Sequence, residues 1–287
     1  MGNEKMYISK YDHKIRFLSY DGIELTGTFA KSKRQTKAAV LMLHGIPSWQ
    51  HEWGFYSKMA ECFCDNGIAS LRFNYRFWYD GLNKYGNLNK LTLSQLINDS
   101  ESAYWKLRGL ITGRVPIYVV ARSFAGGVSI KWINAFNRSI NKIYSMAPCF
   151  DYEYELFGNY KNYTSAYNQL LNEEQINLLT KNGYINQELN YGREMCNEAH
   201  VFNIYNELKI INSKIIIFHG TGDTIVPIDI TEKILMDYPE IELIKIKDAK
   251  HSFGGLKRSD GTSDSSTKNK NIQFIINRVV KDILCEL

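Results

Sequence analysis

Short apolar runs that alternate with segments of helical periodicity constrain the fold of this chain more than any other feature of its sequence. Such runs, rich in β-branched residues, are typical of strands buried on both faces of a parallel sheet. Strands separated by helices at this spacing indicate an α/β fold with a mostly parallel, doubly wound sheet. We expect strands at residues 38–43, 68–74, 142–148, 214–218 and 241–247, with one more from residue 117 to a turn at residue 123. We expect helices at residues 52–66, 91–110, 228–238 and 271–284, with another beginning near residue 124.

Two alternating runs near the N-terminus predict an antiparallel pair of strands that opens the sheet. Residues 14–20 and 23–30 read as strands, and the dipeptide Asp21-Gly22 joins them. An Asp-Gly pair between alternating runs is a strong signal for a β-hairpin. The first two strands are therefore expected to run antiparallel to each other.

The alternation of strands and helices breaks between residues 149 and 210. In a chain of 287 residues, one α/β domain with an insertion explains this break better than two independent domains. We expect a core of residues 1–148 and 211–287, with residues 149–210 forming a helical cap over the functional edge of the sheet. Six aromatic residues of this segment could line an acyl or aryl pocket or could pack the cap onto the core: Tyr152, Tyr154, Phe157, Tyr160, Tyr163 and Tyr167.

Ser123 lies at the turn between a predicted buried strand and the helix that follows it. Small residues two positions before and after a serine allow a sharp, strained turn that exposes the serine hydroxyl group. Here those positions are Ala121 and Ala125, and Gly126 and Gly127 permit close packing of the helix on the strand. Ser123 is therefore a candidate nucleophile. The alternative is that it serves only as a helix N-cap, a position that also favours serine.

An acid and a histidine follow two later strands. Asp223 lies in a glycine-bearing loop after the strand at residues 214–218, and His251 follows the last strand. Open α/β sheets place functional groups just beyond the carboxyl ends of their strands. The order serine, acid, histidine is one of the known chain orders of a catalytic triad. Asp229 is the alternative acid, but its position in the first turn of a helix explains its carboxylate through the helix dipole.

The strand at residues 38–43 ends in His44-Gly45-Ile46, a candidate anion-stabilising loop. In serine hydrolases a loop after this strand supplies one backbone N–H group to the oxyanion, and the residue after the nucleophile supplies the other. The candidates are the backbone amides of Ile46 and Phe124. The alternative is that His44 and Gly45 form an ordinary turn at the end of a strand.

Composition argues against several other classes of protein. The formal net charge is +5, but basic and acidic residues are interleaved, and neither a basic stripe nor a known nucleic-acid module is visible. The five cysteines are scattered, which predicts reduced thiols rather than disulfides or structural zinc. The sequence shows neither a secretory signal nor an apolar run of membrane-spanning length, so we expect a cytoplasmic protein.

Taken together, these motifs resemble the α/β-hydrolase superfamily over nearly the whole chain. The sequence looks most similar to capped bacterial esterases of the cinnamoyl and feruloyl type and to related acyl hydrolases. The resemblance implies that Ser123 is the nucleophile. It further implies that His251 is the general base and then acid, that Asp223 orients it, and that the oxyanion donors are at Ile46 and Phe124. It is carried by His44-Gly45, Ile68–Phe73, Ala121–Gly127, Ala147-Pro148, His219–Asp223 and His251–Phe253.

The turn at Ser123 departs from the pattern of these relatives. It reads Ala-Arg-Ser-Phe-Ala where they usually have Gly-His-Ser-Gln-Gly, and the segment after Phe73 lacks their glycine-rich turn. Arg122 is therefore unusual. It could pair with a neighbouring acid, or it could bind a carboxylate of the substrate.

The resemblance implies a hydrolase of a small or medium acyl or aryl ester, and the chemistry requires neither a metal nor an organic cofactor. Thioesterase, acyltransferase and small-peptidase activities are alternatives on the same triad, because a fold does not decide the reaction. A non-catalytic ligand-binding homologue is a further alternative, although such proteins usually lose a member of the triad. The sequence does not indicate an oligomeric state.

Overall fold

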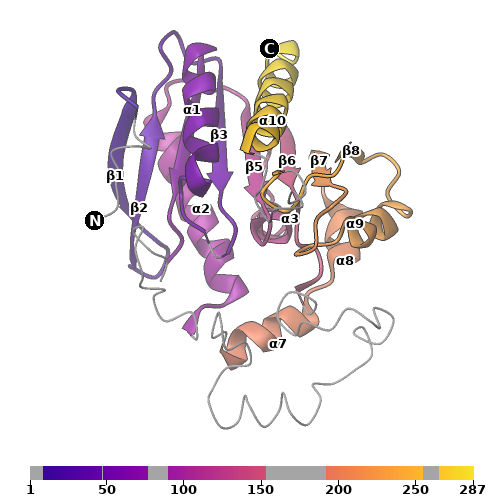
Figure 1. Ribbon diagram of the computed structural model, residues 1–287. Coiled ribbons are helices and arrows are strands. Elements are labelled where there is room, and N and C mark those ends of the chain that lie inside the picture. Colours follow the sequence, from indigo (N-terminus) through magenta and orange to yellow (C-terminus); the bar gives the residue numbers. More distant parts are fainter. Residues whose placement is uncertain (1–8, 47, 77–89, 153–191, 255–264) are drawn as a thin grey trace.

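The computed structural model describes residues 9–46, 48–76, 90–152, 192–254 and 265–287. Eight strands in this part of the chain form one sheet with the order β1-β2-β4-β3-β5-β6-β7-β8 (Figure 1). The strands are β1 (Asp12–Leu18), β2 (Glu24–Ala30), β3 (Ala38–Leu43), β4 (Ile68–Phe73), β5 (Ile117–Arg122), β6 (Lys142–Met146), β7 (Lys214–Gly220) and β8 (Glu242–Ile246).

The N-terminal strands pair as the Asp-Gly turn predicts. β1 and β2 run antiparallel, with Leu18 opposite Glu24 at the turn, where Gly22 has a φ of 84° that suits glycine. β2 is also antiparallel to β4, whereas every pair in the order from β4 to β8 is parallel. The predicted mostly parallel sheet with an antiparallel N-terminal pair is confirmed.

Helices cover both faces of the sheet. They are η2 (Glu52–Gly54), α1 (Phe55–Asp65), α2 (Leu93–Leu110), α3 (Ala125–Ala135), α7 (Arg193–Val201), α8 (Ile204–Ile210), α9 (Ile228–Leu235) and α10 (Ser265–Cys285). Side chains of β3 alternate between two hydrophobic clusters, as the period of two in a strand requires. Leu41 and Leu43 belong to a cluster that also contains side chains of α2, α3, α8 and α9. Val40 and Met42 belong to a second cluster with side chains of α1 and α10, which lie side by side on the other face (Figure 1).

Two helices begin three or more residues after or before the predicted position. The segment expected as one helix over residues 52–66 opens with the 3-10 turn η2, in which Glu52 and Trp53 have φ values of 45° and 54°. Left-handed backbone conformations cannot continue a right-handed helix, so α1 starts only at Phe55. The last helix is longer than expected, because α10 begins at residue 265 rather than at residue 271.

The described helices of the segment predicted as a cap contact the core. The Ser94 backbone N–H and hydroxyl groups, at the start of α2, donate to the Glu198 carboxylate of α7 at 2.9 and 2.7 Å. Glu207 of α8 accepts hydrogen bonds from Lys131 and Asn134 of α3. β6 and β7, which flank this segment in the sequence, pair directly with each other. The chain therefore leaves the sheet and returns to it at neighbouring strands.

Tyr152 packs on the core. Its ring centroid lies 4.5 Å from that of Phe124 and 4.7 Å from that of Phe202, and its hydroxyl group donates to the Phe124 carbonyl oxygen at 2.8 Å. Of the two roles open for the aromatic residues, packing is the one that Tyr152 has. The other five aromatic residues, Tyr154, Phe157, Tyr160, Tyr163 and Tyr167, lie outside the described residues.

Candidate active site

Ser123 occupies a strained turn between β5 and α3. Its φ is 50°, a left-handed conformation that is uncommon for residues with a Cβ atom and that clusters at functional sites. The Ser123 N–H donates to the Met146 carbonyl oxygen at 2.9 Å, and its own carbonyl oxygen accepts the Cys149 N–H at 2.9 Å, so both sides of the turn are held. Phe124, rather than Ser123, is the N-cap of α3. The N-cap alternative for Ser123 was therefore wrong.

His251 and Asp223 meet Ser123 at the carboxyl edge of the sheet. His251 Nε2 lies 3.0 Å from Ser123 Oγ, and His251 Nδ1 lies 2.8 Å from Asp223 Oδ2. Because β7 and β8 are neighbouring parallel strands, the loops that carry Asp223 and His251 emerge side by side. A carboxylate can only accept, so the imidazole proton is on Nδ1, and Nε2 is the atom that can accept the Ser123 hydroxyl proton.

The Asp223 carboxylate is buried and held as an anion. Its Oδ1 atom accepts the backbone N–H groups of Ile225 and Val226 at 2.9 and 3.0 Å. Burial raises the pKa of this carboxyl group, but hydrogen bonds from His219 and His251 outweigh burial and bring the pKa of Asp223 well below its ordinary value. A fixed anion at this position stabilises one tautomer and one orientation of His251.

His219 organises the loop that carries Asp223, a role that sequence reasoning missed. Its Nε2 atom lies 2.8 Å from the Val226 carbonyl oxygen, and its Nδ1 atom lies 3.1 Å from the Thr231 hydroxyl group of α9. The carbonyl oxygen can only accept, so Nε2 carries the proton and Nδ1 accepts from Thr231. Asp229, the alternative acid, is exposed in the first turn of α9, whereas Asp223 contacts His251.

His44 fixes the loop after β3. Its Nε2 atom accepts the Tyr75 backbone N–H at 3.2 Å, so the proton is on Nδ1, which lies 2.7 Å from the Gly45 carbonyl oxygen. Burial lowers the pKa of His44 to about 4 and outweighs the opposing effect of Glu52, so the ring is neutral at pH 7. This ring does more than end a strand, because it holds the peptide that follows Gly45.

The two predicted oxyanion donors belong to segments that adjoin Ser123. Gly45 lets the loop approach the turn, because a Cβ atom at Gly45 would lie only 2.9 Å from the Ser123 Cβ atom. The Gly45 carbonyl group and the Ile46 N–H group share one peptide plane, so the His44 contact also sets the direction of that N–H group. Phe124 directly follows Ser123 at the start of α3.

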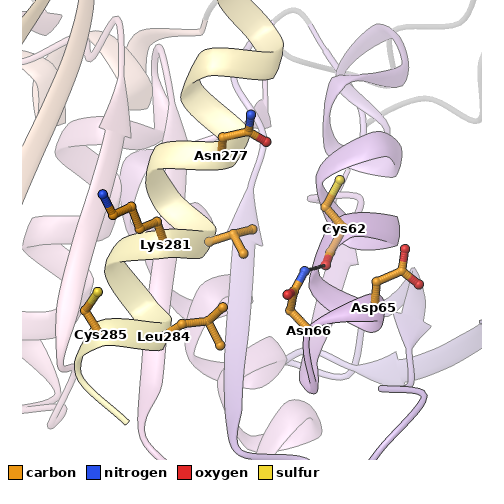
Figure 2. Close-up of a pocket in the computed structure, with 8 residues that line it drawn as sticks. Cys62, Asp65, Asn66, Asn277, Lys281, Leu284 and Cys285 are labelled. Atoms are coloured by element: carbon orange, nitrogen blue, oxygen red, sulfur yellow. Dashed lines mark hydrogen bonds between the residues drawn. The ribbon is translucent and has the colours of Figure 1, made fainter.

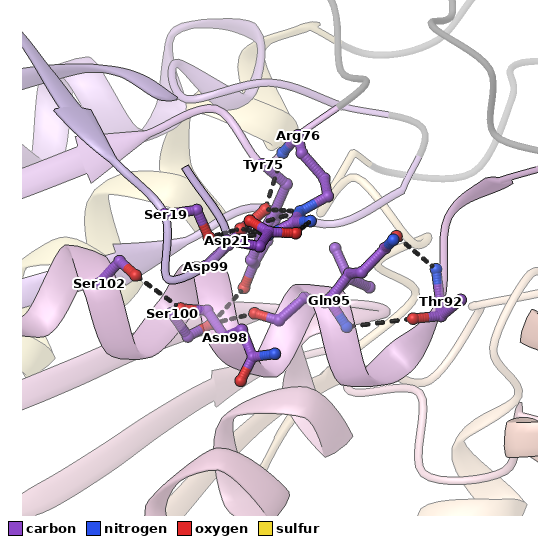
Figure 3. A network of polar contacts seen from close by, with 11 residues as sticks. Ser19, Asp21, Tyr75, Arg76, Thr92, Gln95, Asn98, Asp99, Ser100 and Ser102 are labelled. Carbon is purple, nitrogen blue, oxygen red and sulfur yellow. Dashed lines mark hydrogen bonds and ion pairs between the residues drawn. The ribbon is translucent and has the colours of Figure 1, made fainter. Parts of the chain in front are cut away.

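A buried polar network joins α2 to Tyr75 and Arg76, the segment after β4 whose backbone binds the His44 ring (Figure 3). The Arg76 guanidinium donates to Asp99 at 2.7 and 3.0 Å, and both side chains are almost fully buried. Asp99 also accepts the Arg76 backbone N–H at 2.9 Å, and the Tyr75 and Ser100 hydroxyl groups lie 3.1 Å apart. α2 thereby fixes the Tyr75 backbone that binds the His44 ring.

Glu52 and Arg122 form a buried ion pair beside Ser123, and sequence reasoning did not identify Glu52. The Arg122 guanidinium binds one oxygen of the Glu52 carboxylate, and the other oxygen accepts the Gly45 N–H at 2.7 Å. Arg122 Nη2 also donates to the His251 carbonyl oxygen at 3.3 Å. Of the two roles open for Arg122, the structure shows pairing with a neighbouring acid.

A cavity of about 380 Å³ opens at Ser123. Its walls come from the loops after β3, β5, β7 and β8 and from η2, and they include Ile46 and His251. Trp53 and Ile225 contribute apolar surface to these walls, since 63% and 55% of their areas are exposed. The site therefore offers an apolar surface next to the three polar side chains.

A second cavity, of about 520 Å³, lies between α1 and α10 (Figure 2). Cys62, Asn277 and Lys281 are among the side chains that line it, and it contains none of the predicted site residues. In the described ranges, no group of three or more histidine, cysteine or acidic side chains is placed to hold a metal ion. Among the same residues, no helix combines the length and the apolarity needed to cross a membrane.

Comparisons with known proteins establish the fold. No family model and no curated protein matches the sequence. Est1E from Butyrivibrio proteoclasticus, in a structure with bound ferulic acid, is similar at a TM-score of 0.71 and 15% identity, over 95% of this chain and 98% of that chain. Alpha/beta hydrolase domain-containing protein 10 from mouse is similar at a TM-score of 0.64 and 18% identity, over 94% of this chain and 99% of that chain. A serine hydrolase without a lid from Xanthomonas campestris is similar at a TM-score of 0.59 and 11% identity, over 98% of this chain and 97% of that chain. The chain thus has the α/β-hydrolase fold.

Proposed function

We propose that this chain is a serine hydrolase that cleaves a carboxylic ester through an acyl-enzyme on Ser123. The observation that carries the proposal is the line of contacts from Asp223 through His251 to the Ser123 hydroxyl group, at 2.8 and 3.0 Å. These groups lie within the hydrogen-bond reach that activation of a serine nucleophile requires. A protein of the same fold that is named a serine hydrolase supports the same class of reaction.

The proposed mechanism has two halves. His251 Nε2 accepts the Ser123 hydroxyl proton as Oγ attacks the carbonyl carbon of the ester, and Asp223 stabilises the imidazolium that forms. The imidazolium then donates its proton to the leaving alcohol, which gives the acyl-enzyme. Water, deprotonated by His251, attacks the acyl carbon, and the imidazolium then returns that proton to Ser123 Oγ as the acid is released. Every proton moves between Ser123, the substrate, water and His251, so the mechanism needs no cofactor.

The backbone amides of Ile46 and Phe124 are the proposed oxyanion donors. Ile46 lines the cavity together with Ser123, and its N–H direction is set by the His44 contact to the Gly45 carbonyl group. Donors that are aimed in advance at the developing charge lower the barrier by roughly 3 kcal/mol for one donor. The Gly45 and His44 contacts therefore have a catalytic purpose in this proposal.

The substrate class in this proposal is a small or medium acyl or aryl ester. Trp53 and Ile225 supply the apolar surface against which such a group would pack. The ferulic acid bound to Est1E, a protein of the same fold, supports an aryl acid as one product. Residues 149–210, which leave and re-enter the sheet at β6 and β7, would form the cap over this surface.

A panel of p-nitrophenyl esters, acyl-CoA thioesters and aminoacyl anilides tests the proposal. We expect the wild type to turn over esters fastest and Ser123→Ala to lose turnover with a nearly unchanged melting temperature. Ser102→Ala is the matched control, because the Ser102 hydroxyl group only donates to a carbonyl oxygen within α2. Ester hydrolysis that survives in Ser123→Ala, or a wild type that hydrolyses no ester, would contradict the proposal.

A further inference from the structure

The pair of Glu52 and Arg122 links two loops that the triad does not hold together. One Glu52 oxygen accepts the Gly45 N–H at 2.7 Å, and the other binds Arg122, which donates onward to the His251 carbonyl oxygen at 3.3 Å. We propose that Glu52 and Arg122 are positioning residues that hold the oxyanion loop and the histidine loop around Ser123. This inference rests on the proposed function.

Glu52 and His44 both bind Gly45, each through a different backbone group of that residue. Glu52 fixes the N–H group of Gly45, and His44 fixes its carbonyl group at 2.7 Å. With both polar groups of Gly45 held, the peptide plane that contains the Ile46 N–H has little freedom to rotate. A mobile donor would have to reorganise in the transition state, whereas a fixed one stabilises charge without that cost.

Arg122 acts on the histidine loop in the same way. It is the last residue of β5 and directly precedes Ser123, so its backbone leads into the nucleophile turn. Its guanidinium has a planar fork of donors, which lets one group bind Glu52 and another bind the His251 carbonyl oxygen. The position of His251 is thereby tied to the segment that carries Ser123.

Burial and strain argue that this pair does more than add stability. The Glu52 side chain is fully buried and that of Arg122 is 9% exposed, and a buried ion pair contributes little net stability because both charges lose water. Glu52 and Trp53 also have left-handed φ values of 45° and 54°, which cost free energy in residues other than glycine. Residues with such strained backbone conformations cluster at functional sites, where the surrounding structure holds a side chain in one position.

A purely structural ion pair is the alternative, and two variants separate it from positioning. Arg122→Lys keeps a cation opposite Glu52, but a single ammonium group lacks the fork that also reaches His251. The double variant Glu52→Gln/Arg122→Met removes both charges together, so neither remains buried alone. For both variants we expect kcat to fall, on the order of 10²-fold for the double variant, with KM nearly unchanged.

Glu101→Gln is the matched control. Glu101 is another buried glutamate paired with an arginine, Arg138, and it also accepts the Trp132 indole N–H at 2.9 Å. This pair joins α2 to the segment just after α3, and neither residue is among the residues that line the cavity at Ser123. Its loss should lower the melting temperature and leave kcat per folded molecule within about twofold of the wild type, as expected for surface and packing changes away from a site.

The measurement is kcat and KM on a p-nitrophenyl ester, with the folded active fraction counted by a fluorophosphonate titration. A fall in kcat of both pair variants, with KM and the control unchanged, supports the positioning role. If Arg122→Lys folds and keeps its kcat within about twofold, the role is overturned while the proposed function stands. Arg122→Lys decides the matter alone if the double variant does not fold. A wild type that neither turns over the ester nor is labelled overturns both proposals.

Discussion

Two ionisable side chains near Ser123, Asp223 and His44, have protonation states that their neighbours determine. Asp223 stays ionised because two backbone N–H groups and His251 donate to it, and the protonated Nε2 atom of His219 lies 3.4 Å from its Oδ2 atom. His44 stays neutral because it is buried, with a backbone N–H group on one ring nitrogen and a carbonyl oxygen on the other. The donors and acceptors of the site are therefore assigned before a substrate arrives.

The first prediction at this scale concerns the acid. Asp223→Asn should lower kcat on the order of 10⁴-fold, because the amide group of asparagine can donate to Nδ1 and hold His251 in the wrong tautomer. Hydrolysis of a p-nitrophenyl ester measures the effect. Asp229→Asn is the control, since Asp229 is exposed on α9, and its kcat should match that of the wild type. A loss in Asp229→Asn with an active Asp223→Asn would reassign the acid.

A second prediction concerns pH. In the unfolded chain His44 binds a proton near its ordinary pKa of 6.5, whereas burial delays protonation in the folded chain until about pH 4. The unfolded state binds more protons in this window, so the free energy of unfolding should fall as the pH drops from 6.5 to 4, by about 3 kcal/mol from this residue. His51 acts in the same direction, because burial lowers its pKa to about 3.

Urea denaturation at a series of pH values measures this dependence. His44→Gln removes one titrating group, so the free energy of unfolding should depend less steeply on pH between 6.5 and 4 than in the wild type. The effect of His51 remains in that variant and provides an internal reference. An equally steep dependence in His44→Gln would mean that His44 is not a buried neutral ring.

Among the elements of the fold, α3 approaches the sheet closely because Gly126 and Gly127 in its first turn have no side chain. A Cβ atom at Gly126 would lie 2.5 Å from the Pro148 Cβ atom, so Gly126→Ala should destabilise the protein by about 1–3 kcal/mol through overpacking. Gly109 in α2 is the matched control, because a Cβ atom there meets nothing within 4 Å. Gly109→Ala should stabilise the protein by up to about 1 kcal/mol. Thermal and urea unfolding compare the two variants, and equal effects would contradict the packing described for α3.

The elements that could be predicted from the sequence are those whose signal is local. The central strands were predicted because each is a short apolar run, and the N-terminal hairpin because Asp21-Gly22 joins two alternating runs. Glu52 was missed because its role depends on a left-handed turn and on contacts with Arg122, 70 residues away. His219 was missed for a similar reason, since its partner Thr231 belongs to the next helix. Residues whose function depends on tertiary contacts leave no periodic signal.

Across the whole molecule, the sheet gathers at one edge groups that are far apart in the chain. Ser123 and His251 are separated by 128 positions, yet they meet because β5 and β8 lie in one parallel array and end at the same edge. Two supports behind the site add to this arrangement: the Arg76–Asp99 network on α2, and the Glu52–Arg122 pair. The central claim is that this architecture makes Ser123 nucleophilic.

Labelling of the folded chain with a fluorophosphonate, followed by peptide mapping, tests that claim most directly. The account predicts one phosphonylated residue, Ser123, in the wild type, and little labelling in Asp223→Asn or after unfolding in urea. The site cavity also contains Ser48 and Ser252, which provide neighbouring hydroxyl groups for comparison. A wild type that stays unlabelled, or one labelled at Ser48 or Ser252 instead of Ser123, would contradict the account.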